Sequence, residues 1–151
     1  MRWSPHVTVA AIIENNGKFL LVEETINGEL KLNQPAGHWE DNESLIDAVA
    51  RETLEETAYH FQPKHLVGIY QWQHPASTTT YLRFAFSGQL GKLTQLALDP
   101  DIDRAIWLSL EEIKARKEQH RSPQLLLCIE DYLDGKQFGL EILRRLPSDD
   151  I

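Results

Sequence analysis

The stretch that decides the fold and the chemistry is residues 37–59, which read GHWEDNESLIDAVARETLEETAY. It holds five Glu and two Asp against a single Arg, Arg51, so its local net charge is −6. The whole chain of 151 residues has a net charge of −8, from 15 basic and 23 acidic residues. Most of the excess negative charge is therefore concentrated in one short segment, and this concentration needs a physical reason.

A helix from Glu43 to about His60 is the structure that this segment favours, with Asp41 or Asn42 as its N-cap. At about 100° per residue, Glu52, Glu55 and Glu56 fall on one face, with Cβ atoms about 5–6 Å apart. Like charges at this spacing destabilise a helix unless a cation binds them. Mg²⁺ is a suitable cation, because it prefers carboxylates, waters and phosphate oxygens. The alternative is a solvated acidic face that binds nothing.

The spacing of the charged residues resembles the signature of the Nudix hydrolase family. That signature is Gly, five residues, Glu, seven residues, Arg-Glu, an aliphatic residue, any residue, Glu-Glu, any residue, Gly and an aliphatic residue. The chain matches it with Gly37, Glu43, Arg51, Glu52, Glu55 and Glu56. It departs from it at Thr53 and Tyr59, where the family has aliphatic residues, and at Ala58, where the family has Gly. All of the charged positions are intact, so we expect catalysis to be retained.

A closer likeness is to the NudJ type of bacterial phosphatases. It is carried by short matches spread over most of the chain: 6–10, 22–28, 33–38, 71–72, 82–84, 101–103 and 121–123. This resemblance implies an α/β (α+β) fold, an α/β/α sandwich with a mixed β-sheet. It also implies Mg²⁺-dependent hydrolysis of phosphoanhydride bonds in nucleoside tri- and diphosphates, and of thiamine-pathway pyrophosphates such as hydroxymethylpyrimidine pyrophosphate and thiamine pyrophosphate, with release of orthophosphate.

The resemblance also assigns roles within the acidic helix. Glu52 and Glu56 are expected to be direct Mg²⁺ ligands, with Mn²⁺ as an alternative metal. Glu55 is expected to be a ligand or the base, and the Gly37 carbonyl a further ligand. We expect Arg51 to orient Glu43 or the Glu cluster, which makes Glu43 a supporting residue. Two other readings stay open: cleavage of linked nucleoside diphosphates, such as ADP-ribose or dinucleoside polyphosphates, and a Nudix module that binds nucleotides without turnover.

The general base has several candidates. Glu55 and Glu52 on the helix are candidates. So is the acidic loop at residues 99–103, where Asp101 and Asp103 are the favoured catalytic residues. Solvated acids are common in loops, and this is the alternative for both. The loop can act only if the strand that follows it lies beside the helix.

Four residues outside the helix are candidates for substrate binding. Trp72, with Tyr70 two residues earlier, has the ring to stack on a base, although an aromatic residue on a strand more often lies in the core. Arg83 alternates with apolar neighbours and is expected to reach a phosphate or solvent. Gln34 and His38 flank the loop before the helix and have donors for a phosphate, although a surface role for His38 is equally plausible.

Composition sets the remaining expectations. A length of about 150 residues favours one domain over residues 1–151. No stretch approaches the roughly 18 apolar residues of a membrane helix, and the start at Met1 shows no signal-peptide pattern. The acidic balance argues against a nucleic-acid partner. The single Cys128, expected in the core, favours a reducing compartment, and hence the cytoplasm. Both a monomer and a homodimer are compatible with the sequence.

Overall fold

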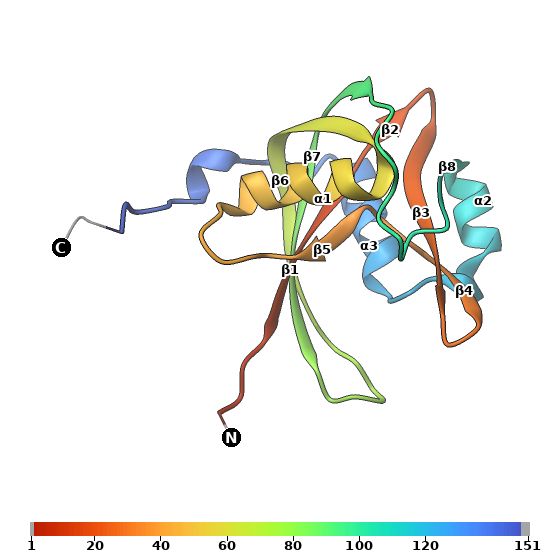
Figure 1. Cartoon of the computed structure of the whole chain (residues 1–151), viewed down its shortest axis with the longest axis horizontal. Helices are drawn as coiled ribbons and strands as arrows, with labels where there is room; N and C mark the ends of the chain where they lie inside the picture. The colour runs from red at the N-terminus through yellow and green to blue at the C-terminus, as the bar shows by residue number, and fades with distance from the viewer. Residues whose placement is uncertain (1, 149–151) are drawn as a thin grey trace.

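The computed structural model describes residues 2–148 and shows a mixed α+β fold of two sheets and three α-helices (Figure 1). The helices are α1 (Leu45–Thr57), α2 (Leu110–Ala115) and α3 (Gln124–Leu133), and two short 3₁₀ turns are η1 (Lys117–Gln119) and η2 (Leu140–Ile142). The strands are β1 (His6–Ile12), β2 (Glu14–Asn15), β3 (Lys18–Ile26), β4 (Glu29–Asn33), β5 (Ala36–His38), β6 (Tyr59–Gln73), β7 (Thr80–Leu93), β8 (Arg104–Ser109) and β9 (Phe138–Gly139).

The larger sheet has the strand order β5-β1-β7-β6-β9. In it β1 runs parallel to β7 and antiparallel to β5, which makes the sheet mixed, as predicted. The smaller sheet has the order β2-β3-β4, with β8 also paired to β3. The long antiparallel hairpin of β6 and β7 projects beyond the body of the molecule (Figure 1).

Helices cover both faces of the larger sheet. On one face, α1 buries Ala48 and Val49 against a cluster that includes Val9 and Phe86. On the other face, α3 buries an apolar stripe of Leu125, Cys128 and Ile129. The α/β/α sandwich expected from the sequence is confirmed, and Cys128 lies in the core as predicted. No helix in the described range is long and apolar enough to span a membrane.

The predicted start of the acidic helix was wrong. α1 begins at Leu45, and its N-cap is Ser44, whose hydroxyl accepts a hydrogen bond from the Asp47 N–H at 2.9 Å. Asn42 instead takes a positive φ of 62°, which fits a turn rather than a cap. The side chain of Glu43 lies before the helix and contacts Arg51. The N-cap therefore falls two or three residues later than predicted.

Three further segments differ from the sequence-based expectation. Residues 36–38, predicted as loop, form β5 because their backbone pairs with β1. The sequence predicts strands at 65–73 and 79–90, and the observed β6 and β7 are longer, with pairing that starts at Tyr59 opposite Leu93. The sequence also predicts a loosely held tail after Leu140; Leu143 packs against the core, whereas residues 144–148 are exposed.

Candidate active site

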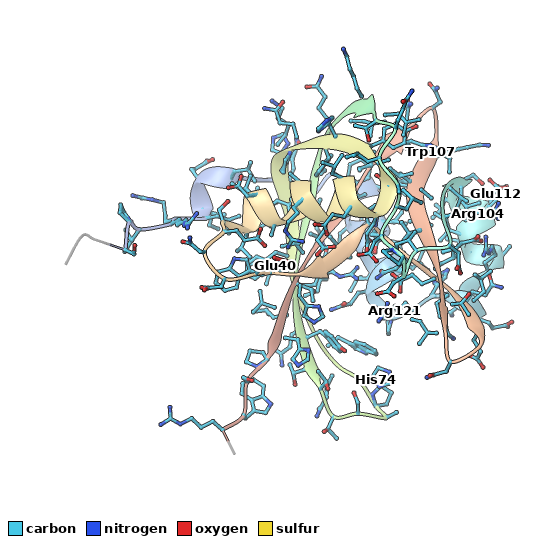
Figure 2. The ribbon with its side chains drawn as sticks, in the orientation of Figure 1. Glu40, His74, Arg104, Trp107, Glu112 and Arg121 are labelled. Atoms are coloured by element: carbon cyan, nitrogen blue, oxygen red, sulfur yellow. The ribbon has the colours of Figure 1, made fainter. Side chains whose placement is uncertain are left out.

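A cavity of about 870 Å³ lies where α1, β4, β5, the β6–β7 hairpin and the start of α3 meet. Glu40, Arg121 and His74, which are labelled in Figure 2, all line it. Its other walls include Glu52 and Glu56 from α1. The acidic residues of the helix therefore face a space large enough for a small-molecule substrate.

Glu56 is a buried carboxyl group with little to balance its charge. It is 8% exposed, and Oε1 accepts a hydrogen bond from the Ala36 N–H at 2.9 Å. Burial, together with the charges of Glu52, Glu24 and Asp99, raises its pKa to about 9. Without a cation beside it, Glu56 is therefore protonated at neutral pH.

Glu52 lies directly against the backbone of β5. A Cβ atom at Gly37 would come within 2.1 Å of the Glu52 carboxyl carbon, so only glycine leaves room for this side chain. Burial raises the pKa of Glu52, and the neighbouring Arg51 lowers it in part. This contact brings the Gly37 backbone and the Glu52 carboxylate to the same point of the cavity wall.

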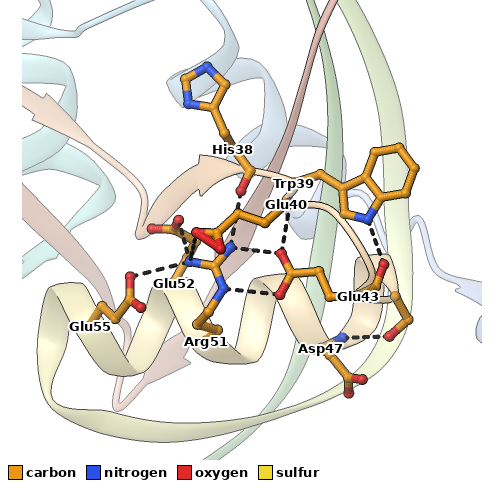
Figure 3. A network of polar contacts seen from close by, with 9 residues as sticks. His38, Trp39, Glu40, Glu43, Asp47, Arg51, Glu52 and Glu55 are labelled. Atoms are coloured by element: carbon orange, nitrogen blue, oxygen red, sulfur yellow. Dashed lines mark hydrogen bonds and ion pairs between the residues drawn. The ribbon is translucent and has the colours of Figure 1, made fainter.

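Arg51 connects the start and the middle of α1 (Figure 3). Its Nε and Nη2 donate to the two carboxylate oxygens of Glu43 at 3.0 and 2.8 Å. Its Nη1 contacts Glu52 at 2.8 Å and Glu55 at 3.3 Å, and Nη2 donates to the His38 carbonyl at 3.1 Å. The Arg51 guanidinium holds the pKa of Glu43 below its usual range. In this structure Arg51 is thus the cation that balances Glu43, Glu52 and Glu55.

The structure separates the candidates for the general base. The loop before β8 lies beside α1, because the Asp99 N–H donates to the Glu55 carbonyl at 2.8 Å. Asp99 and Asp101 line the cavity, whereas the Asp103 carboxylate accepts from the Thr25 hydroxyl at 2.6 Å and does not line it. Glu55 is exposed, contacts Arg51 and lies outside the cavity lining.

The predicted substrate contacts are also divided. Trp72 and His38 line the cavity, and the Trp72 ring stacks on Tyr81 at 6.0 Å between centroids. Tyr70 lies in the core instead, where its hydroxyl donates to Asp131 at 2.8 Å. Burial lowers the pKa of His38, which therefore favours its neutral form.

Arg83 and Gln34 are buried together behind this cavity wall. Arg83 lines the cavity but is only 4% exposed, so the sequence-based alternative of a solvated side chain was wrong. Gln34 accepts from Arg83 Nη1 at 2.7 Å and donates to the Leu125 carbonyl at 2.7 Å. Both ends of the Gln34 amide are therefore engaged within the protein.

Sequence reasoning gave no site role to several cavity residues. They are Glu24, Asn33, Arg121, Ser122 and Gln124. Their positions depend on β3, β4 and the start of α3 meeting in space, which no local periodicity reveals. The one available signal was that most of them fall within the short segments that carry the NudJ-type likeness.

The residues present fit a hard divalent cation by chemical type. Glu52, Glu56 and the Gly37 carbonyl offer oxygen donors, and Glu56 has no cationic partner among residues 2–148. Within those residues, no three His, Cys, Asp or Glu side chains converge closely enough to hold a metal as they stand. Metal binding would therefore require small movements, and the release of Glu52 or Glu55 from Arg51.

Comparisons with known proteins agree with this geometry. The NUDIX domain family matches residues 4–127. Phosphatase NudJ of Escherichia coli K12 is 44% identical over 142 residues, which cover 93% of this chain and 92% of the relative. A NUDIX hydrolase structure from Nitrosomonas europaea is 51% identical with a TM-score of 0.92, and the match covers 95% of this chain and 98% of that one.

A more distant structure shares the fold alone. It is a bifunctional NMN adenylyltransferase/ADP ribose pyrophosphatase from Francisella tularensis, complexed with AMP and a Mn ion. It is 21% identical with a TM-score of 0.64, and the match covers 87% of this chain and 42% of that one. The family match, the two strong relatives and the intact acidic signature on the cavity wall lead to one conclusion: the chain belongs to the Nudix hydrolase family.

Proposed function

We propose that this protein hydrolyses phosphoanhydride bonds in nucleoside tri- and diphosphates, and in thiamine-pathway pyrophosphates, with Mg²⁺ as the cofactor and release of orthophosphate. The observation that carries the proposal is the buried Glu56 carboxyl, which shares a cavity wall with Glu52 and has no cation beside it. The similarity to phosphatase NudJ favours phosphate release over other Nudix reactions.

Glu52, Glu56 and the Gly37 carbonyl are the residues that would hold the metal ion, with Glu55 joining them once it leaves Arg51. The bound ion would neutralise phosphate oxygens and lower the pKa of an attacking water. Mn²⁺ would fit the same oxygen donors, and the Mn ion of the Francisella tularensis relative supports this alternative. Arg51 would then hold Glu43 and balance whichever carboxylates remain free.

A carboxylate near the substrate takes the proton of the attacking water as its oxygen bonds to phosphorus and the anhydride P–O bond breaks. Glu52, Glu55, Asp101 and Asp103 stay our candidates, and Asp99 of the same acidic loop also lines the cavity. The cavity lining favours Asp101 over Asp103, because the Asp103 carboxylate is bonded to Thr25. We propose that His38 and Trp72 contact the substrate, and that Gln34 acts by holding Arg83.

The test is a phosphate-release screen over nucleoside di- and triphosphates and thiamine-pathway pyrophosphates, with Mg²⁺, Mn²⁺ or EDTA. We expect metal-dependent release of orthophosphate. Asp101→Asn, Asp103→Asn and Glu55→Gln, assayed in parallel, would locate the base, with the largest loss of kcat at the true one. The exposed acid Glu118, changed to Gln, is the matched control. Absence of turnover with every substrate and metal would overturn the proposal.

The second candidate is cleavage of nucleoside diphosphates linked to another group. The cavity volume of about 870 Å³ favours it, since it also accommodates ligands larger than a single nucleotide. Chromatography of the products separates the two: pairs of nucleotide fragments from ADP-ribose or dinucleoside polyphosphates, against orthophosphate. A module that binds nucleotides without turnover would show neither product.

We further propose that residues 1–151 act as one domain in the cytoplasm, on small molecules rather than nucleic acids or membranes. The net charge of −8 and the buried, single Cys128 support this setting. Both a monomer and a homodimer fit the proposal. Sedimentation velocity of the purified protein would decide between them.

A further inference from the structure

Arg83 is a buried cation without an acidic partner. It lies on β7 in the middle of the larger sheet, and its side chain is 4% exposed. Its Nη1 donates to Gln34 Oε1 at 2.7 Å and its Nη2 to Asn33 Oδ1 at 3.1 Å, and both acceptors are neutral amides. No carboxylate among residues 2–148 lies within 4.0 Å of the Arg83 nitrogens. A buried charge is costly unless an opposite charge or strong acceptors balance it, so this site favours an anion.

The other cations of the cavity wall differ in this respect. Arg121 pairs with Glu24, and Lys31 pairs with Glu29 at 3.3 Å. A guanidinium carries five N–H donors, and the two amide bonds leave at least Nε of Arg83 without a partner. Arg83 is therefore a buried cation with a spare donor and no carboxylate partner, whereas Arg121 and Lys31 each pair with a carboxylate.

A second unpartnered group lies near Arg83, because Gln34, which accepts from Arg83, also donates to the Leu125 carbonyl at the start of α3. Gln124, the first residue of α3, lines the cavity and is only 6% exposed. Its amide nitrogen has no hydrogen-bond partner among residues 2–148. The N-terminus of α3 also lies here, and its first N–H, that of Gln124, donates to Ser122 Oγ at 3.2 Å. A helix N-terminus attracts negative charge, so a donor, a cation and a helix dipole act in the same direction.

The segment of residues 33–37 connects the side of the cavity that holds Arg83 and Gln124 with the acidic end, which holds Glu52 and Glu56. Asn33 and Gln34 hold Arg83, whereas the Ala36 N–H holds Glu56 and Gly37 lies against Glu52. Gln34 and Ala36 are only two residues apart, with a bend at Pro35 between them, so the two groups of contacts are close along the chain. Neighbouring phosphoryl groups of one substrate can bridge anchors at this separation.

Resting on the proposed function, we infer that Arg83 and Gln124 form an anion subsite for a second phosphoryl group, next to the one that is detached. The acidic end would take the departing phosphate with its metal ion, and the Arg83 end would bind the phosphate that stays on the product. The subsite makes the enzyme select compounds with at least two linked phosphates and reject monophosphates.

The test measures binding of methylene diphosphonate, a diphosphate analogue that cannot be hydrolysed, by calorimetry in the presence of Mg²⁺. Arg83→Gln should weaken binding at least about tenfold, because it removes the charge, and Arg83→Lys should recover part of the loss. The same Arg83→Gln variant should raise KM for nucleoside diphosphates more than it lowers kcat. Arg144→Gln, which removes an exposed cation, should change neither value.

Because Arg83 is buried, Gln124→Glu provides a variant that keeps the fold. A carboxylate at a helix N-terminus is favourable for the helix, and here it would pair with Arg83 and exclude the analogue. We expect at least about a tenfold loss of methylene diphosphonate binding. Wild-type affinity in folded Arg83→Gln and Gln124→Glu would overturn the inference. A loss of nucleoside binding with unchanged binding of methylene diphosphonate would also overturn it, since the subsite would then recognise a ring rather than an anion.

These outcomes are separate from a failure of the proposed function. If the wild type binds methylene diphosphonate but releases no phosphate from any substrate, the proposed function fails and the subsite still stands. If the wild type releases phosphate and Arg83→Gln binds the analogue normally, the subsite fails alone.

Discussion

Glu23 and Glu56 are two buried glutamates with opposite surroundings. Glu23 on β3 is 4% exposed and Glu56 on α1 is 8% exposed. Glu23 is bonded to Arg104 and to Arg116, the latter at 2.7 Å, and the Arg104 contact is the main cause that lowers its pKa. Glu56 has one backbone N–H and three neighbouring acids, and its pKa is raised to about 9.

This difference separates structure from function. The Glu23 cluster is balanced by the protein's own cations, so it contributes to folding and needs no ligand. The Glu56 cluster is left unbalanced in a cavity, which costs stability unless a cation arrives from outside. On our proposal, the chain gives up stability at the site where the metal ion would bind. Substitutions at Glu56 therefore test the proposed site, and the same substitutions at Glu23 are their control.

The sharpest way to break the comparison is to neutralise each glutamate. We expect Glu56→Gln to lower kcat at least about a hundredfold, because the charge that supports the transition state is lost. The folded, metal-free variant should be more stable than the wild type at neutral pH, because Gln does not ionise in the unfolded chain and so avoids the cost of protonating Glu56 on folding. Phosphate release and thermal unfolding would measure the two effects.

Glu23→Gln should behave in the opposite way. Removing its charge leaves two arginines without their partner, and we expect a loss of about 2 kcal/mol of unfolding free energy. That loss corresponds to a fall in Tm of about 4–8 °C for a chain of this size. The activity of the folded fraction should stay within about twofold of the wild type.

Near-normal turnover in the Glu56→Gln variant would refute the assignment of Glu56 as a metal ligand.

The pH dependence of the metal-free protein sharpens the comparison further. The folded-state pKa of Glu56 lies above its ordinary value of 4.5, so its contribution to stability is lost as pH rises from about 4.5 to about 9. The pKa of Glu23 is lowered, so its contribution is present above pH 4.5 and is lost as pH falls below it.

Thermal unfolding in EDTA from pH 5 to pH 9 would measure these slopes. We expect the difference in Tm between Glu56→Gln and the wild type to grow in favour of the variant as pH rises. Binding of Mg²⁺ to the wild type at pH 7 should release about one proton, measurable by calorimetry in buffers of different ionisation heat. Parallel Tm curves and no proton release would show that Glu56 is already ionised.

Gly37→Ala tests the acidic end through its geometry rather than its charge. The new Cβ would lie within 2.1 Å of the Glu52 carboxyl carbon and displace this flexible side chain, but not the backbone. We expect the Mg²⁺ concentration for half-maximal activity to rise about tenfold. Gly139→Ala is the matched control, because its Cβ would meet the Glu141 carboxylate at 2.1 Å, outside the cavity. An equal effect in both variants would point to general strain instead.

The acidic helix and its neighbours were the predictable part of the molecule. The 3.6-residue period and the signature spacing place Glu52 and Glu56 on one face, and both line the cavity. The start of the helix was predicted wrongly, because Asp41, Asn42 and Ser44 all have side chains suited to an N-cap. Their choice was decided by Arg51, which binds Glu43 from a turn further along the helix.

The positions of Arg83 and Gln124 in the cavity could not be predicted from the sequence, for a different reason. Arg83 acquires its place from the parallel pairing of β7 with β1 and from amide oxygens about 50 residues away in the chain. Gln124 reaches the same cavity from the start of α3. Long-range pairing of this kind produces no periodic pattern in the local sequence. The alternation of polar and apolar residues therefore predicted only that Arg83 contacts either a phosphate or solvent.

Ala58 tests whether the stability of α1 can change without changing the site. It is the residue after the helix and takes the left-handed conformation, with φ at 64°, where the family signature has Gly. We expect Ala58→Gly to raise the free energy of unfolding by about 0.5–1 kcal/mol, because the strain of a Cβ at positive φ exceeds the added entropy of an unfolded Gly. Ala50→Gly, in the interior of the same helix, should instead lower it by about 1 kcal/mol. Chemical unfolding would measure both changes, and the Mg²⁺ dependence of activity should match the wild type in each. A different result would be a change in the Mg²⁺ dependence that follows the change in unfolding free energy in both variants. The carboxylates around Glu56 would then stabilise the fold, as Glu23 does, and the two glutamates would not differ in role.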